Sequence, residues 1–275
     1  MFDLFEKWDG APKTDGSSSS SSGVSPSQTQ DSYSSPVFQK KLFVLSVGGS
    51  VFFNEKLRAP EIAKFCECIN ELIREGYEFV IVVGGGRVAR VYQAGAKALG
   101  ANNFELDEVG IAITRTNALL FIYSINDAWH NVLSDPKDAK NVLLLKKVPV
   151  FAGNLPGQTT DAVAAIIAEL IGADFINLSN VDGVYSADPA KEDHARLFKE
   201  LSHIKMVSLI KAQAAKPGAH TFIDPHAANI LTRSKVKSFF INGSDLDNFK
   251  SVVHGLEFKG TIVQTVSTDD VILDE

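Results

Sequence analysis

Two glycine-rich turns, each directly after an apolar run, are the residues of this chain best suited to chemistry. The apolar runs cover 42–47 and 79–83, and the residues that follow them are Gly48, Gly49, Ser50, Gly84, Gly85 and Gly86. A strand that ends in glycines and leads into a helix presents backbone N–H groups at the positive end of the helix dipole, with no side chain in the way. Each turn is therefore a predicted anion site. Two such sites predict two phosphorylated ligands, or one ligand with phosphates at both ends.

A basic side chain follows the second turn. Arg90 lies one helical turn after the glycines, where its guanidinium reaches an anion held by them. Arg87 fits a solvated helix face as well as it fits a role in binding. Neither turn has the spacing of a Walker loop or of a dinucleotide-binding fingerprint, so these two common phosphate motifs are excluded.

A polar loop at 153–161 separates an apolar run from an alanine-rich helix. Either Thr159 or Thr160 can cap this helix, and Asp161 falls in its first turn. A carboxylate at that place, near both glycine turns, is suited to hold Mg²⁺ or to orient a phosphate-binding group. A well-capped helix is the plainer interpretation, and it leaves the length of the polar loop unexplained.

A second polar segment, 180–189, brings two carboxylates, Asp182 and Asp188, close to the ring of Tyr185. In structural terms it is a tight turn, a short strand and a second turn. In chemical terms the carboxylates suit the hydroxyls of a ribose, and the ring suits the flank of an adenine.

Strands and helices must alternate to position these residues. Apolar residues at helical spacing cover 62–73 and stop at Gly76. Further helices are expected at 88–99, 106–125, 162–171 and 227–233, and strands at 42–47, 79–83, 142–145, 148–151, 175–178, 236–241 and 261–264. Residues 202–220, rich in Lys and Ala, are expected to form a mobile lid. The alternation predicts an α/β fold, a three-layer α/β/α sandwich with a mostly parallel central sheet, and both glycine turns at the carboxyl ends of strands.

Composition limits the partners and the compartment. The 275 residues carry a net charge of −6 with no basic block, which disfavours nucleic acid as a partner. No apolar run reaches the ~18 residues of a membrane span, and no secretory signal is evident. Cys66 and Cys68 lie two apart on an expected helix, so they do not pair, and reduced thiols fit a cytoplasmic protein. The scattered histidines show no metal-ligand spacing, so no metal site built from histidine or cysteine side chains is expected.

The first 39 residues differ from the rest. An unbroken serine tract covers 17–22, and such a segment buries too little apolar surface to offset its ordering entropy, so a disordered tail is expected. Phe2, Phe5 and Trp8 at its start fit either an unstructured end or a docking motif.

Several of these segments, in this order and spacing, resemble those of the amino acid kinase superfamily. They are the strand that leads into Gly48, the Gly84 turn with Arg90, the helix start at 159–165, and the sequence Asn-Val-Asp-Gly-Val-Tyr-x-x-Asp-Pro at 180–189. Within the superfamily the chain is most similar to uridylate (UMP) kinases of the archaeal type, which segments 110–118 and 224–234 also resemble. The resemblance covers about 41–264.

The resemblance implies an amino acid kinase-like fold and a Mg²⁺-dependent transfer of the γ-phosphoryl group of ATP to UMP, giving UDP and ADP in pyrimidine nucleotide biosynthesis. It implies an acceptor-binding lobe at about 40–155, an ATP-binding lobe at about 156–275, and a homo-oligomer, a hexamer built from dimers. ATP would meet Gly48, Gly49, Ser50, Asn180, Asp182, Gly183, Tyr185 and Asp188. UMP would meet Gly84, Gly85, Gly86, Arg90, Asp107, Asn154 and Thr160. Asp161 and Arg90 would be the catalytic residues.

The chain departs from the wider superfamily in its lysines. Ser46 stands where many members carry a lysine just before the first glycine turn, and none is evident near Asp224 unless Lys216 reaches it. Phosphoryl transfer needs positive charge, so Mg²⁺, arginine or another lysine must offset the difference. Two alternatives stay open. One is an isopentenyl phosphate kinase, although that family has a histidine shortly after the second turn and 87–92 has none. The other is a non-catalytic relative that binds a nucleotide or an oxyanion.

Overall fold

The structure is a computed structural model, and it describes residues 41–54, 57–192, 194–214 and 221–265. The chain divides into two units, Met1–Phe38 and Gln39–Glu275, and the described residues all belong to the second unit. The predicted disordered tail therefore lies outside the described residues. The two lobes expected within 40–275 stay a prediction.

Within the described ranges, seven strands form one sheet in the order β3-β2-β1-β4-β6-β7-β5. The strands are β1 (Leu42–Val47), β2 (Glu78–Val83), β3 (Val150–Phe151), β4 (Asp174–Ser179), β5 (Glu200–Ser202), β6 (Ser238–Asn242) and β7 (Thr261–Gln264). Every neighbouring pair is parallel except β6 and β7, which are antiparallel. The predicted mostly parallel sheet is confirmed.

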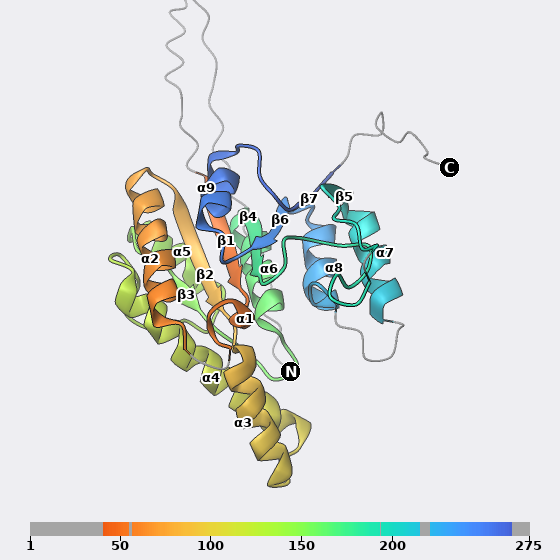
Figure 1. The fold of residues 1–275 in the computed structure, drawn as a ribbon. Coiled ribbons are helices and arrows are strands. Elements are labelled where there is room, and N and C mark those ends of the chain that lie inside the picture. Colours follow the sequence, from red (N-terminus) through yellow and green to blue (C-terminus); the bar gives the residue numbers. More distant parts are fainter. Residues whose placement is uncertain (1–40, 55–56, 193, 215–220, 266–275) are drawn as a thin grey trace, which may run out of the picture. The chain divides into compact units, whose positions relative to one another are not determined.

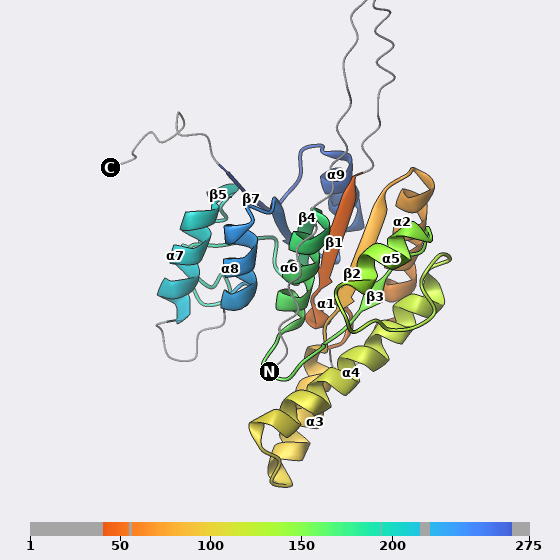
Figure 2. The ribbon, with the colours of Figure 1, turned by 180° about the vertical axis from the view of Figure 1, so that it is seen from behind.

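Helices cover both faces of this sheet, because side chains alternate between the faces along each strand. In β1, Phe43, Leu45 and Val47 belong to one buried cluster and Val44 to the other. The first cluster is completed by α1 (Gly49–Phe52), α2 (Ala59–Arg74), α4 (Asn103–Ser124) and α9 (Leu246–His254). The second is completed by α5 (Asp138–Leu144), α6 (Thr160–Ile171), α7 (His203–Ala214) and α8 (Pro225–Arg233). Figure 1 shows α2 and α9 in front of the strands, and Figure 2, from behind, shows α5 and α6. The three-layer α/β/α sandwich is confirmed.

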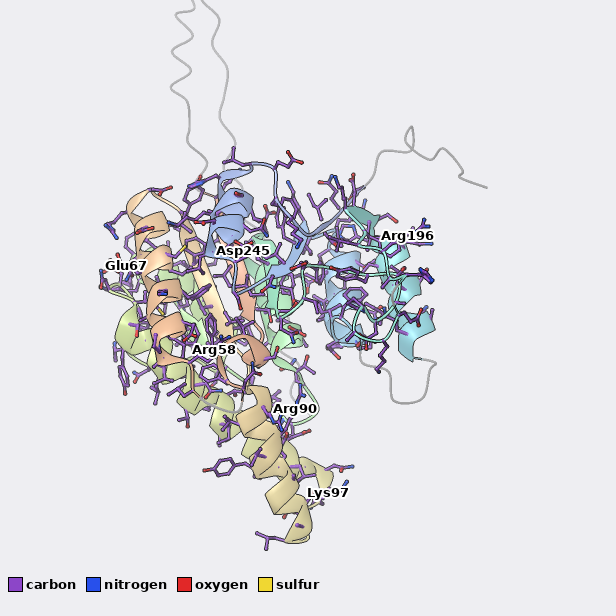
Figure 3. The ribbon with its side chains drawn as sticks, viewed as in Figure 1. Arg58, Glu67, Arg90, Lys97, Arg196 and Asp245 are labelled. Carbon is purple, nitrogen blue, oxygen red and sulfur yellow. The ribbon has the colours of Figure 1, made fainter. Side chains whose placement is uncertain are left out.

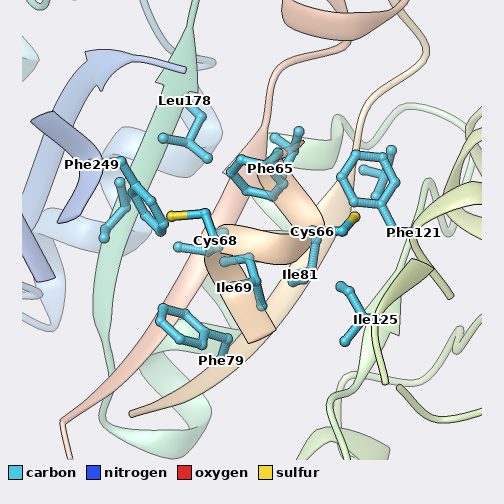
Figure 4. Packing of buried hydrophobic residues seen from close by; sticks show 14 of the residues in the cluster. Phe65, Cys66, Cys68, Ile69, Phe79, Ile81, Phe121, Ile125, Leu178 and Phe249 are labelled. Carbon is cyan, nitrogen blue, oxygen red and sulfur yellow. The ribbon is translucent and has the colours of Figure 1, made fainter. Parts of the chain in front are cut away.

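The core on the α2 face is aromatic and holds both cysteines. Phe65 of α2 packs against Phe121 of α4 and Phe249 of α9, with ring centroids 6.0 and 5.7 Å apart. In Figure 4 the sulfur of Cys66 points toward Phe121 and that of Cys68 toward Phe249. The two thiols are unpaired, and burial raises the pKa of Cys66 to about 12 and that of Cys68 to about 11. They pack as apolar groups, because thiols with such pKa values carry almost no thiolate at neutral pH.

One expectation for local structure is wrong. The run 142–145 is not a strand, because Asp138–Leu144 forms α5, with Ala139 and Val142 buried one helical turn apart. A short apolar run does not distinguish a strand from a helix. Within the segment expected to form a lid, 202–220, Ser202 ends β5 and 203–214 form α7, while 215–220 lie outside the described residues, so the lid stays a prediction. The other expected helices and strands are present, with ends shifted by a few residues.

The two glycine turns pack directly against each other. β1 and β2 are neighbours with Val47 opposite Val83, so the turns after them meet. A Cβ on Gly49 would lie 1.9 Å from the nitrogen of Gly86. Gly86 has a φ of +62°, and a Cβ there would lie 2.3 Å from a carbonyl oxygen. No residue with a side chain fits at this contact.

Replacing Gly49 with alanine is therefore expected to destabilise the protein. The Cβ would force two backbone segments apart, and such overpacking costs about 1–3 kcal/mol of unfolding free energy. Gly95, in the middle of α3 (Gly86–Ala98), is a matched control, because a Cβ there meets no atom within 4 Å. Gly95→Ala is expected to be neutral or to stabilise by up to ~1 kcal/mol. Urea denaturation measures both, and equal stability of the two variants would contradict the packing described.

Candidate active site

A pocket of about 470 Å³ lies at the carboxyl ends of β1, β2 and β4. The expected site residues that line it are Gly48, Gly49, Ser50, Gly84, Gly85, Gly86, Arg90, Asp107, Thr160 and Asp161. Side chains that the sequence did not indicate also line it, among them Gln93, Thr114, Asn177, Thr221 and Phe222. Both glycine turns and Asp161 therefore share one pocket, as their placement at strand ends predicts.

Asp161 is held at the floor of this pocket by the two central strands. Thr159 is the N-cap of α6, accepting a hydrogen bond from an N–H three residues on, so Asp161 lies in the first helical turn. Ser46 Oγ donates to Asp161 Oδ1 at 2.6 Å, and Asn177 Nδ2 donates to the same oxygen at 3.2 Å. Ser46 and Asn177 are partners in the β1–β4 register, which places both donors beneath one carboxylate oxygen.

The electrostatics of Asp161 follow from its surroundings. Burial raises the pKa of its carboxyl, and the charge of Asp224 raises it further. Hydrogen bonds from Ser46, from Asn177 and from the backbone of Asp224 act in the opposite direction. Asp224 is itself the N-cap of α8, where its Oδ2 accepts from the backbone N–H of Ala227 at 3.0 Å. The carboxylate is thus desolvated, and neutral or backbone donors take the place of a cationic partner.

Ser46 and Asn177 left a signal in the sequence. Ser46 is the one polar residue of β1, Asn177 lies between apolar neighbours inside β4, and each is at most 5% exposed. Buried polar side chains need hydrogen-bond partners. Because both side chains point to the same face of the sheet at adjacent positions, a shared polar partner was predictable, although its identity was not.

Part of each glycine turn belongs to the sheet. The N–H of Gly48 donates to the carbonyl of Leu178 at 2.8 Å, and that of Gly84 donates to the carbonyl of Val47 at 3.0 Å. These two N–H groups are therefore not available to an anion. The first N–H groups of a helix have no partner within it. At the start of α3 the N–H of Arg87 donates to the carbonyl of Phe53 at 2.8 Å, which leaves the N–H groups of Gly85 and Gly86 as the candidate donors of the second turn.

Basic side chains are few in this pocket. Arg90 lines it from the second turn of α3 and is exposed, whereas Arg87 is not among the lining residues. Among the described lining residues Arg90 is the one cation, and Asp107 and Asp161 are the two acids. Lys216 lies outside the described residues. Figure 3 shows Arg90 near the start of α3 and Lys97 near its end.

The loop after β3 closes the pocket on the α4 side. Asp107 Oδ2 accepts a hydrogen bond from the backbone N–H of Gly157 at 2.7 Å. The carboxylate therefore ties α4 to this loop and keeps a second oxygen for a ligand. Asn154 lies in the same loop, half-buried between lining residues Gly153 and Leu155, and does not itself line the pocket.

The expected ATP segment after β4 lies outside this pocket. Asp182 binds Lys259 Nζ at 2.6 Å and Asn242 Nδ2 at 3.3 Å, and the hydrogen bond from Lys259 lowers its pKa. Asp188 Oδ1 accepts from the backbone N–H of Ala190 at 3.0 Å. Besides Asn154, the expected residues that do not line the pocket are Asn180, Asp182, Gly183, Tyr185 and Asp188. The segment continues directly from Ser179, which lines the pocket, so it extends the same edge of the sheet.

Two further features bear on the class of protein. No group of three or more His, Cys, Asp or Glu side chains suited to a metal ion occurs in the described part of the chain. Within the same residues, no helix combines the length and the apolar character that a membrane span requires.

The stability of the protein is expected to depend on the charge of Asp161. A carboxyl whose pKa is raised on folding contributes stability that is present below its unfolded pKa and lost as pH rises through its folded pKa. Asp161→Asn does not titrate, so it should melt at a higher temperature than the wild type at pH 7. The difference should shrink as the pH is lowered toward 4. Thermal melts in the presence of EDTA test this, and a difference that does not change with pH would show that the carboxyl is not desolvated.

Relatives of known structure share the fold. The crystal structure of uridylate kinase from Archaeoglobus fulgidus superposes with a TM-score of 0.71 at 41% identity, covering 80% of this chain and 99% of that chain. A UMP kinase from Ureaplasma parvum superposes with a TM-score of 0.69 at 22% identity, covering 82% and 100%.

Sequence relatives match over nearly their whole length. A uridylate kinase of Archaeoglobus fulgidus is 43% identical over 221 residues, which are 80% of this chain and 98% of that protein. A uridylate kinase of Pyrococcus abyssi is 39% identical over 225 residues, with the same coverage. The sequence model of the amino acid kinase family matches residues 41–242. Because this match spans most of the chain and agrees with relatives matched almost end to end, the chain belongs to the amino acid kinase family.

Proposed function

We propose that this protein is a UMP kinase, which transfers the γ-phosphoryl group of ATP to the phosphate of UMP and releases UDP and ADP. The observation that carries the proposal is the single pocket in which two glycine turns meet beside Asp161. The 43% identity to an archaeal uridylate kinase, over 98% of that relative, supports UMP as the acceptor. Such a reaction is a step of pyrimidine nucleotide biosynthesis.

The geometry supports a direct transfer. The turn at 48–50 holds the ATP phosphates, and the turn at 84–86, with Arg90, holds the phosphate of UMP. Because Gly49 and Gly86 are in backbone contact, two phosphates bound to these turns lie next to each other. When two reactants are held next to each other, they react without first meeting in solution. Proximity and orientation then lower the activation barrier of the transfer.

Charge must be supplied along with the substrates. The described lining residues offer one cation and two carboxylates to a triphosphate and a monophosphate. Mg²⁺ commonly binds through one or two protein carboxylates together with substrate phosphates, and the pocket carboxylate of Asp161 fits that role. When bound with ATP, Mg²⁺ supplies the positive charge that phosphoryl transfer requires. The chain itself holds Asp161 through Ser46 and Asn177 and pairs the acceptor phosphate with Arg90.

The segments around the pocket make the remaining contacts with the two nucleotides. Asp107 accepts from the ribose hydroxyls of UMP with the carboxylate oxygen that Gly157 leaves available, and Asn154 and Thr160 line the acceptor. The ATP ribose and adenine lie along the segment after β4, at Asn180, Asp182, Gly183, Tyr185 and Asp188. A hexamer built from dimers and a cytoplasmic location belong to the same proposal.

The acceptor is tested by a panel of phosphates with purified full-length protein, ATP and Mg²⁺, with ADP release measured by a coupled assay. UMP is expected to give turnover, and isopentenyl phosphate is not. Turnover with isopentenyl phosphate alone would show that isopentenyl phosphate, not UMP, is the acceptor. Binding of UMP with no ADP release would indicate a non-catalytic relative.

In the variant Asp161→Asn, kcat should fall far more than KM for UMP rises, because the carboxylate acts at the transfer step.

Arg90→Ala is expected to weaken UMP binding strongly, since a guanidinium paired with a phosphate is rarely replaceable. Loss of such a charged hydrogen bond corresponds to about a tenfold to hundredfold increase in KM for UMP. Lys97→Ala is the matched control, because Lys97 is a cation of the same helix outside the pocket. Steady-state kinetics compare the two variants. If both leave KM for UMP unchanged, Arg90 is a surface residue and not a phosphate ligand.

A further inference from the structure

Asn117 is a buried polar residue of α4 that the roles described so far do not use. Its side chain is 6% exposed and lies next to Ala118, which is fully buried in the aromatic core. Asn117 Nδ2 donates to the carbonyl oxygen of Gly84 at 3.0 Å and to that of Gly85 at 3.3 Å. The amide therefore binds two successive peptide groups of the second glycine turn.

The geometry of the peptide unit relates this contact to the direction of two N–H groups at the pocket. In a trans peptide the C=O of one residue and the N–H of the next point in opposite directions. When the carbonyls of Gly84 and Gly85 are drawn toward α4, the N–H groups of Gly85 and Gly86 are directed away from α4. Both glycines line the pocket, and within the described part of the chain neither N–H has a protein acceptor.

We propose that Asn117 is a positioning residue, which orients the Gly85 and Gly86 N–H groups toward the phosphate of the acceptor without touching the ligand. The inference rests on the proposed function, in which this turn holds the phosphate of UMP. A turn of consecutive glycines has little conformational preference of its own. A side chain that binds two of its carbonyls supplies the preference that the glycines lack.

The same face of α4 holds a second wall of the pocket. Thr114, one helical turn before Asn117, is 6% exposed, and its Oγ1 accepts from the backbone N–H of Gly153 at 2.9 Å. Thr114 Oγ1 in turn donates to the carbonyl of Ile111 at 2.7 Å. Two buried polar side chains at i and i+3 thus attach the glycine turn and the loop after β3 to one helix. These two contacts explain why Thr114 and Asn117, which are polar, are buried in segment 110–118.

The test compares ligands with and without the phosphate. Asn117→Leu has a similar volume and no donor, so the two carbonyls lose their partner and the turn loses its orientation. In the full-length protein, calorimetric titration should show UMP affinity reduced by about tenfold to a hundredfold, the scale of a hydrogen bond to a charged group. Affinity for uridine, which has no phosphate, should stay within about twofold. In steady-state assays KM for UMP should rise more than KM for ATP.

Asn70→Leu is the matched control. Asn70 of α2 is 5% exposed, and its side chain also binds backbone: Nδ2 donates to the carbonyl of Ser124 at 3.4 Å, and Oδ1 accepts from the N–H of Asn126 at 3.1 Å. It lies outside the pocket lining. Asn70→Leu should lower the melting temperature as a buried polar substitution does and leave the ratio of UMP to uridine affinity unchanged. Asn117→Ala, which removes both hydrogen bonds without adding bulk, serves if Asn117→Leu does not fold.

The outcomes separate this inference from the proposed function. If the wild type prefers UMP to uridine and the Asn117 variants keep that preference, the positioning role is wrong and the proposed function stands. An equal loss of UMP and uridine affinity also overturns the positioning role, because it indicates a general deformation of the pocket. If the wild type binds UMP no better than uridine, the proposed function fails, and the inference fails with it.

Discussion

The site depends on one backbone contact, that between the glycine turns after β1 and β2. Parallel neighbouring strands bring their carboxyl ends together, and residues with side chains would keep these two turns apart. Glycine at positions 49 and 86 allows the main chains to touch. A Cβ added to Gly49 would lie only 1.9 Å from the nitrogen of Gly86. A site in which two phosphates exchange a group needs both anion cradles within one pocket. The site therefore requires glycine at positions 49 and 86 as strictly as it requires its polar side chains.

Buried polar residues hold Asp161 and the second glycine turn in place around that contact. Ser46 and Asn177 hold one oxygen of Asp161, and Asn117 holds the carbonyls of the second glycine turn. Each of these amides and hydroxyls is buried, and an unpaired polar group is costly where water is excluded. Hydrogen bonds made there have few competitors, so they define geometry more strictly than exposed contacts do. Among the described lining residues the pocket carries one cation, Arg90, beside two carboxylates.

Much of the site could be predicted from the sequence, because its features are local. A glycine turn after an apolar run, Arg90 one turn later and Asp161 at a helix start are visible in windows of a few residues. The features that were missed are relations between distant segments. Asn177 and Thr114 reach the pocket only through strand register and helix packing. In the run 142–145, three successive leucines after a valine fit a strand as well as a helix. Packing of Ala139 and Val142 on the core favours the helix.

The sequence by itself determined the alternation of strands and helices, the family resemblance and the placement of both glycine turns at strand ends, since these follow from periodicity and from residues adjacent in the chain. The tertiary structure decided which N–H groups remain for a ligand, because Gly48 and Gly84 donate theirs to carbonyls of neighbouring strands. It also decided that Asp182 is paired with Lys259. The side chains that donate hydrogen bonds to Asp161 within the described residues, Ser46 and Asn177, are neutral. Hydrogen bonds and desolvation depend on distances between residues far apart in the chain, and only the folded arrangement sets those distances.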